Sequence, residues 1–144
     1  MFNLPAEDRL SSWAEHRAHL EKSNDPLTEV IEFWRDAPFI PYNQKVDQYN
    51  QRSWPTPWEI IVDNKYDDFT KALMMAYSIK FTQRFSKSSI QIRTLVDNSK
   101  STCYNVVCVD GTWVINYNDN TVVSIDNIPD NFLIENLIEV DLPR

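Results

Sequence analysis

The chain has 144 residues, a formal net charge of −7 and 12% aromatic residues, including five tryptophans. A sequence this rich in apolar and aromatic side chains is expected to fold rather than to stay disordered. The excess of carboxylates argues against non-specific binding to nucleic acid or to an anionic membrane, because both need Lys and Arg to neutralise phosphates. We therefore expect no nucleic-acid partner and no membrane partner.

Two cysteines, Cys103 and Cys108, lie five residues apart in a segment with strand character. They would point to opposite faces of one strand, where a disulfide between them is geometrically implausible. Reduced, buried thiols are the expectation. No apolar run approaches the roughly 20 residues of a membrane helix, and residues 1–10 lack the basic and apolar regions of a signal peptide. We expect a protein that is not secreted.

Gly111 is the single glycine of the chain, whereas asparagine is abundant. Asparagine also tolerates the left-handed backbone region, so it can serve turns that glycine usually serves. Five asparagines are predicted to form turns: Asn64, Asn98, Asn118, Asn120 and Asn127.

Two amphipathic helices are predicted in the first quarter of the chain. The first spans 7–22 and has an imperfect apolar stripe among many charges. The second spans 26–35, with Asp25 as N-cap and Pro26 at the first helical position. Its apolar residues follow the i, i+3, i+4, i+7 spacing of one helical face: Leu27, Val30, Ile31 and Trp34.

The segment 37–56 is rich in proline and polar residues and is predicted to be a long loop. Loops of this length often have a function. Thr56 and Glu59 then form the sequence pattern of a capping box around Pro57, which predicts a short helix to about residue 62.

The central helix is predicted over 67–82, where apolar side chains form one broad face. Asp67 and Asp68 at its start suit the positive end of the helix dipole, which favours a capping role. The apolar period then alternates, which predicts four strands over 90–96, 102–109, 112–117 and 121–125. Asp110-Gly111 is a strong hairpin signal, and residues 118–120 form the next turn. Beyond Pro129 the sequence leaves a short helix or a final strand open.

Helices followed by strands, without alternation between them, predict an α+β fold with a mainly antiparallel sheet packed on the central helix. We expect one domain over 1–144, with a helical part over 1–36, the proline-rich loop over 37–56 and an α+β core over 57–144. Seven side chains are predicted to share one core: Phe69, Leu73, Ala76, Ile92, Val107, Trp113 and Ile115.

Residues for common site chemistry are scarce. His16 and His19 lie near Glu15 and Glu21, but no third histidine exists, so an exposed helical face is expected rather than a metal site. One glycine cannot build a phosphate loop. We expect no metal and no cofactor, and a carboxylate-based active site is a distant alternative because sequence does not show the separation of its carboxylates across a cleft.

The proline-rich loop carries more aromatic surface than a solvated connector needs, and interfaces favour Tyr, Trp and Phe. Its aromatic side chains either pack as a corner onto the core or form a partner-binding patch. We predict the partner-binding patch, and we expect the first helix to form part of the same partner surface. The predicted partner-binding residues are Phe39, Tyr42, Tyr49, Trp54 and Trp58.

A helix start over 66–73, followed by strands that end in Val109-Asp110-Gly111-Thr112-Trp113, resembles the core of transglutaminase-like, papain-related domains. In that family a helix begins with a nucleophilic cysteine, one strand carries the catalytic histidine, and the strand after the hairpin carries an aspartate. The resemblance covers roughly residues 56–125 and implies a transglutaminase-like fold.

The family's catalytic positions fall on other residue types here. The cysteine position falls on Asp67, the histidine position near Cys103 or Tyr104, and the aspartate position between Asn116 and Asn118. Acyl transfer by a thiolate needs a base and an orienting group. The resemblance therefore implies a degenerate copy, and we expect no enzymatic activity.

The segment 53–71 also resembles small proteins of tailed bacteriophages, particularly marine and cyanobacterial myoviruses, some of which carry cysteine at the position of Asp67. This likeness implies a protein that acts by protein–protein interaction, as a virion component of the tail, neck or baseplate. Its partners would be other phage structural proteins, and its location the virion or the host cytoplasm. The alternative is a non-virion protein that binds or inhibits a host factor.

Overall fold

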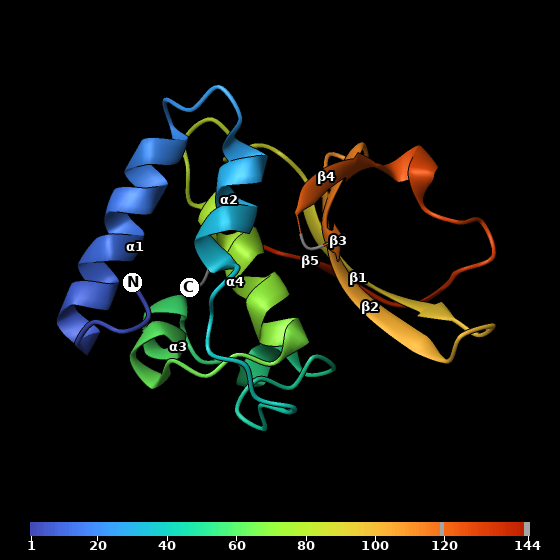
Figure 1. Cartoon of the computed structure of the whole chain (residues 1–144), viewed down its shortest axis with the longest axis horizontal. Coiled ribbons are helices and arrows are strands. Elements are labelled where there is room, and N and C mark those ends of the chain that lie inside the picture. The colour runs from blue at the N-terminus through green and yellow to red at the C-terminus, as the bar shows by residue number, and fades with distance from the viewer. Residues whose placement is uncertain (119, 143–144) are drawn as a thin grey trace.

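The computed structural model describes residues 1–118 and 120–142, in which helices gather on one side and an antiparallel sheet on the other (Figure 1). Asp119, within the predicted turn at 118–120, lies outside the described residues. The helices are α1 (Ala6–Leu20), α2 (Pro26–Trp34), α3 (Pro57–Asp63) and α4 (Asp68–Lys80), with short 3-10 turns η1 (Gln51–Ser53) and η2 (Ile125–Asn127). The strands are β1 (Ile90–Asp97), β2 (Thr102–Val109), β3 (Trp113–Asn118), β4 (Thr121–Ser124) and β5 (Leu133–Glu139).

The predicted helix starts are confirmed with one difference. At α3 both hydrogen bonds of the capping box form, between Thr56 and Glu59. At α2 Asp25 occupies the N-cap position, but its side chain makes no capping hydrogen bond, and its own N–H donates to Ser23 Oγ at 3.0 Å. Proline at the first helical position therefore marks the start of α2 without help from a side-chain cap.

The sheet has the order β4-β3-β2-β1-β5, and all its described neighbours are antiparallel. The predicted four-stranded meander is confirmed. Both turn residues between β2 and β3 have positive φ, 52° at Asp110 and 65° at Gly111, as a tight hairpin turn requires. The segment beyond Pro129, which the sequence left open, forms β5 and pairs with β1. The structure thus adds a fifth strand at the far edge from β4.

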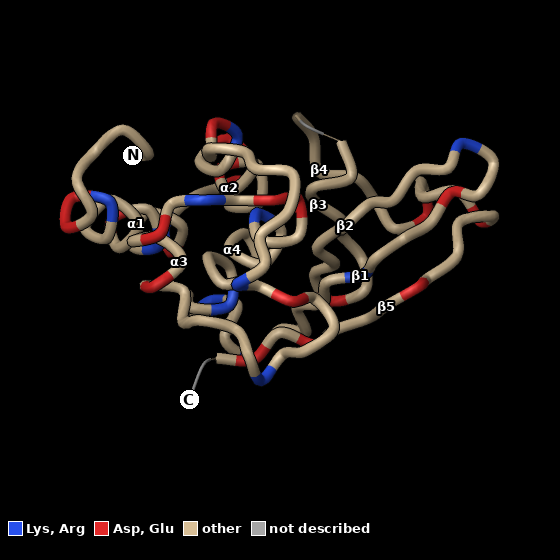
Figure 2. The backbone as a smooth tube through the Cα atoms, turned by 90° about the horizontal axis from the view of Figure 1, so that it is seen from below, with Lys and Arg blue, Asp and Glu red and all other residues tan. Residues whose placement is uncertain are grey.

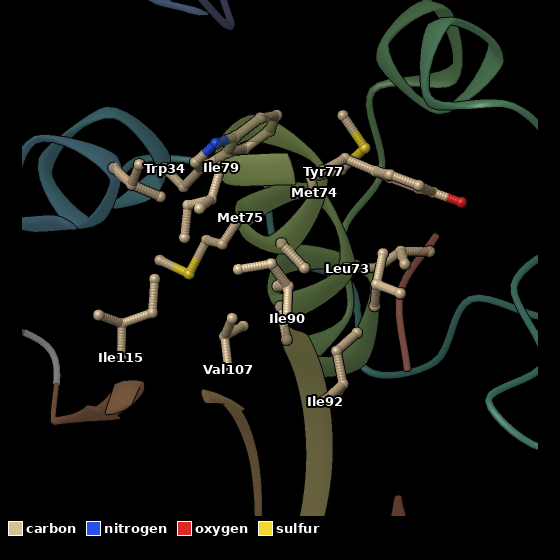
Figure 3. Close-up of a cluster of buried hydrophobic side chains, with 14 of the residues drawn as sticks. Trp34, Leu73, Met74, Met75, Tyr77, Ile79, Ile90, Ile92, Val107 and Ile115 are labelled. Atoms are coloured by element: carbon tan, nitrogen blue, oxygen red, sulfur yellow. The ribbon is translucent and has the colours of Figure 1, made fainter. Parts of the chain in front are cut away.

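The main core lies between α4 and the sheet face that it covers, and α1 and α2 contribute to it from the other side of α4 (Figure 3). Six of the seven predicted core side chains are buried, but Trp113 is 48% exposed. Trp113 opens β3 and pairs with Val109, beside the start of α2, where it lines an open hollow with Pro26 and Leu27. The helical layer ends beside Trp113. The alternation of β3 therefore predicts correctly which sheet face Trp113 lies on, but it does not show that the helices leave this residue uncovered.

The opposite face of the sheet has a smaller apolar cluster of its own. Leu95, Val106, Cys108 and Val114 are buried there. The connection from β4 to β5, which includes η2, packs over them with Ile125, Ile128 and Phe132. This connection is visible as the wide arc beyond β4 in Figure 1.

The turn-forming role predicted for asparagine is confirmed at Asn64, which ends α3 with a φ of 57°, and at Asn98 and Asn120, which lie in turns. Asn98, Asn118, Asn120 and Asn127 are not among the described residues with positive φ. The other non-glycine residues with positive φ are Ser101, Asp110 and Asn116. Asn116 is unexpected because it lies inside β3.

Charged residues of both signs are interspersed over helices and sheet rather than gathered in one block (Figure 2). Within the described residues, no helix has the length and hydrophobicity needed to cross a membrane.

Candidate functional site

Asp67 and Asp68 meet different partners at the start of α4. Asp67 is 8% exposed and is the N-cap. Its Oδ1 accepts hydrogen bonds from the backbone N–H and the hydroxyl of Thr70 at 2.7 and 2.6 Å, and its Oδ2 accepts one from the N–H of Asn43 at 2.9 Å. The capping role expected for Asp67 is present, and the same carboxylate anchors the proline-rich loop to α4.

Asp68 is exposed and points instead toward the sheet. Its Oδ2 accepts a hydrogen bond from Asn105 Nδ2 at 3.0 Å. The backbone carbonyl of Asn105 accepts one from Asn116 Nδ2 at 2.7 Å, and Asn105 Oδ1 accepts one from the hydroxyl of Thr94 at 2.9 Å. These contacts form a polar row, Asp68–Asn105–Asn116, across α4, β2 and β3. The φ of 67° at Asn116 coincides with a register irregularity between Val114 and Asn118.

Of the three degenerate positions expected from the resemblance, Asp67, Tyr104 and Asn116, the polar row contains Asn116. At the other two positions the polar row contains the next residue along the chain. Asp68 stands in the row instead of Asp67 on α4, and Asn105 instead of Tyr104 on β2. The Tyr104 ring lies on the opposite face of the sheet, with centroids 5.1 Å from Tyr117 and 5.6 Å from Phe132. A displacement of one residue along a strand reverses the face, so the sequence alone could not choose between Tyr104 and Asn105.

The two histidines lie in α1, away from this row. His16, expected on an exposed face, is only 8% exposed and stacks on Phe33 of α2 with a centroid distance of 3.9 Å. His19 is exposed, and its Nε2 lies 2.8 Å from Glu29 Oε1. Burial lowers the pKa of His16 to about 4, so this imidazole is neutral in the folded protein at neutral pH. Its burial follows from the packing of α1 on α2.

The buried His16 predicts a loss of stability in acid. Between pH 6.5 and 4 the unfolded chain binds a proton that the folded chain excludes, so the free energy of unfolding falls as the pH falls through this window. The expected contribution is about 3 kcal/mol. Urea unfolding of the parent and of His16→Phe at pH 7 and pH 4.5 measures it. The variant should lose less stability than the parent, whereas His19→Gln should keep the acid dependence, and equal losses for the parent and His16→Phe would contradict this role.

The two cysteines are free and differ in exposure. Cys108 is buried, and this burial raises its thiol pKa. Cys103 is exposed, which corrects the expectation that both thiols are buried. The difference follows the position along β2, because the strand is buried on both faces from Asn105 to Val109, whereas its first three residues extend beyond that cover.

Iodoacetamide should therefore label the two thiols at different rates. We expect Cys103 to react at least about tenfold faster than Cys108 in the native protein, because the thiolate is the reactive form and the Cys108 thiol is both shielded and harder to ionise. Mass spectrometry of Cys103→Ser and Cys108→Ser proteins, each with one thiol, separates the rates. Equal native rates would contradict the burial of Cys108.

The proline-rich loop is held in place by a series of contacts. Its backbone forms a parallel bridge between Phe39 and Tyr66, and the N–H of Ile40 donates to the Tyr66 carbonyl at 3.0 Å. Asn43 is held by Asp67 as described above, and its Nδ2 donates to the Lys65 carbonyl at 3.1 Å. These contacts fix a segment that has little regular secondary structure of its own.

Four of the five predicted partner-binding side chains are exposed. The exposed fractions are 72% for Phe39, 70% for Tyr42, 64% for Tyr49 and 41% for Trp58. We call these four residues the aromatic loop surface. Trp54 differs, because it is half-buried with its ring 5.6 Å from Phe69 and its N–H bonded to the Asp47 carbonyl at 2.6 Å. Trp54 thus lies between the loop and the core.

A groove of about 670 Å³ lies between this loop and α3. Trp58, Pro55 and Val46 give it apolar walls. An ion pair at its rim joins Lys45 Nζ to Asp63 Oδ1 at 3.1 Å. The groove is large enough for a few side chains of a partner polypeptide. Among the described residues, no group of three or more His, Cys, Asp or Glu side chains is placed to hold a metal ion.

Comparison with known proteins finds similarity at the level of structure. No family model and no curated protein matches the sequence. The fold is similar to that of LapG from Legionella pneumophila, with a TM-score of 0.67 and 17% identity. The similarity covers 87% of this chain and 69% of the EGTA-treated LapG structure, and 96% of this chain and 75% of the calcium-bound one.

The likeness to LapG contradicts the expectation that the chain is not an enzyme. That expectation rested on the missing cysteine and histidine at the start of the central helix and in the sheet. The absence of this cysteine and histidine argues against a thiolate activated by an imidazole at the start of the central helix. It does not exclude catalysis by other groups, such as a carboxylate.

The expected α+β fold and its transglutaminase-like character are both confirmed. The start of α4 and the strands β2 and β3 meet at one place, as the resemblance noted in the sequence implies for the family. In this chain the polar row lies at that place. We conclude that the chain has the transglutaminase-like, papain-related fold of LapG.

Proposed function

We propose that the protein acts by binding another polypeptide at the aromatic loop surface and its groove. The observation that carries this proposal is the exposure of Phe39, Tyr42 and Tyr49 on a loop whose backbone is anchored to α4. Aromatic side chains on a fixed backbone lose little conformational freedom on binding, so more of their burial contributes to affinity.

We further propose that the protein belongs to a tailed phage and is a component of its virion, in the tail, neck or baseplate. The sequence likeness of residues 53–71 to small myovirus proteins supports this setting, and the partners are then phage structural proteins. The replacement of the family's cysteine, histidine and aspartate by the polar row supports the view that this copy of the core has diverged from its thiol chemistry. The virion or the host cytoplasm is the corresponding location.

Mass spectrometry of purified particles tests this setting. Stoichiometric copies of the chain in particles are expected for a virion component. Early expression together with absence from particles would overturn the virion assignment and favour the binding of a host factor.

Hydrolysis of a bound polypeptide is the second candidate function. It is favoured by the likeness to LapG and by the exposed Asp68 carboxylate, which Asn105 orients at the start of α4. A carboxylate so placed can accept a proton from a water molecule that attacks a peptide carbonyl.

A fluorogenic casein substrate tests this candidate with the parent and with Asp68→Asn, which keeps the shape of the side chain but not its charge. Turnover by the parent and its loss in the variant would assign hydrolysis to Asp68. No turnover by the parent, or equal turnover by both proteins, would exclude Asp68 as the base for this substrate.

A further inference from the structure

A second cavity, of about 350 Å³, lies between α2, α4 and the β3–β4 hairpin. Figure 1 shows α2 and α4 side by side next to the sheet, and residues of both helices contact each other. Ile31 and Met75 give the cavity an apolar part, and Asn116, the last residue of the polar row, reaches its wall. The volume is near the lower end for small-ligand sites.

Positive charge distinguishes this cavity. Arg35 and Lys71 line it, and none of the described residues that line it is acidic. Neither cation forms an ion pair with residues 1–118 or 120–142, although the chain carries 21 carboxylate side chains against 14 Lys and Arg. Two cations that face one hollow, without an ion-pair partner among the described residues, attract an anion.

Neutral hydrogen-bond donors also line the cavity. Asn118 and Asn120 also face the cavity, and their amide groups can donate to oxygen atoms. A guanidinium beside an ammonium and amide donors suits an oxyanion, and guanidinium binds carboxylate through two parallel hydrogen bonds. The apolar part over Ile31 and Met75 suits a short carbon chain behind that oxyanion.

We propose that this cavity binds a carboxylate carried on a short aliphatic chain. A free dicarboxylic acid and the acidic side chain of a polypeptide both present this group. The cavity shares no lining residue with the aromatic loop surface or its groove, so this inference stands independently of the proposed function.

NMR titration of the full chain with four probes tests the proposal. Glutarate and the capped peptide acetyl-Gly-Glu-Gly-amide carry the carboxylate, glutaramide has the carbon skeleton of glutarate without charge, and inorganic phosphate is a different oxyanion. At least one carboxylate probe should shift the amide signals of Arg35, Lys71 and Asn118 saturably, and glutaramide should not. Tighter binding of glutarate would assign a free acid, and tighter binding of the peptide an acidic side chain.

Two variants test whether the carboxylate probe binds in this cavity. Arg35→Gln and Lys71→Gln should each lower the affinity for the carboxylate probe about tenfold, because each removes one charged contact. Lys100→Gln, which removes an exposed cation from the turn between β1 and β2, is the matched control and should leave the affinity unchanged. Circular dichroism should show the parent fold in all three proteins.

Three results would overturn the proposal. The first is the absence of saturable shifts with either carboxylate probe, and the second is binding that survives both Arg35→Gln and Lys71→Gln. The third is binding of phosphate at these residues without binding of a carboxylate.

Discussion

Replacement of Ser78 by alanine is expected to lower the free energy of unfolding by about 2–5 kcal/mol. The Ser78 hydroxyl accepts hydrogen bonds from the indole N–H groups of Trp13 at 2.9 Å and Trp34 at 3.0 Å, and it donates to the Met74 carbonyl at 2.7 Å. It therefore joins α1 and α2 to α4 at the centre of the helical layer. All three side chains are fully buried. Alanine would leave two buried N–H donors without a partner, and each such donor costs about 1–3 kcal/mol.

Urea unfolding measures this loss, with Ser86→Ala as the control. Ser86 is exposed and its hydroxyl donates to a carbonyl three residues earlier, so its replacement should change stability by less than about 0.5 kcal/mol. A loss below about 1 kcal/mol in Ser78→Ala would show that the two indoles do not depend on this hydroxyl.

Replacement of Asp67 by alanine is expected to cost about 2–4 kcal/mol and to release the proline-rich loop. The variant loses the N-cap of α4, which contributes about 1 kcal/mol, and leaves the buried N–H of Asn43 without an acceptor. Limited proteolysis should then cut within residues 37–56 faster than in the parent.

Asp68→Ala is the matched control for this experiment, because it removes the adjacent carboxylate. Asp68 is exposed and bonds to Asn105 near the surface, so its loss should cost less than about 1 kcal/mol and leave the loop protected. Equal effects of the two substitutions on stability and proteolysis would contradict the division of roles between them.

Local sequence signals predicted much of the fold. The capping box at Thr56, proline at the start of α2 and α3, and the Asp110-Gly111 turn each have a short-range physical cause, and each lies where the sequence placed it. β5 was left open because its existence depends on pairing with β1, about forty residues away along the chain, with a register shift between Thr94 and Leu95. No local period shows such a pairing.

The site was less predictable than the fold because it depends on which elements meet. His16 lies outside the apolar stripe of α1, and its burial comes from Phe33 on another helix. Similarly, Asn105 enters the polar row because the register of β2 turns it toward α4. The cavity lined by Arg35 and Lys71 lies between two helices and a hairpin. The sequence could not predict it, because it forms only when these elements pack together.

Incorporation of the chain into phage particles, measured by mass spectrometry for the parent and for surface variants, tests whether the aromatic loop surface binds a virion partner. The double variant Phe39→Ala plus Tyr42→Ala truncates the aromatic loop surface, whereas Trp113→Ala truncates an exposed aromatic side chain on another part of the molecule. Melting temperatures close to that of the parent would show that both variants fold. Binding through the aromatic loop surface predicts at least about a tenfold loss of incorporation for the double variant and none for Trp113→Ala, because exposed aromatic anchors dominate binding energy at interfaces. Incorporation of the double variant at the parent's copy number would contradict it.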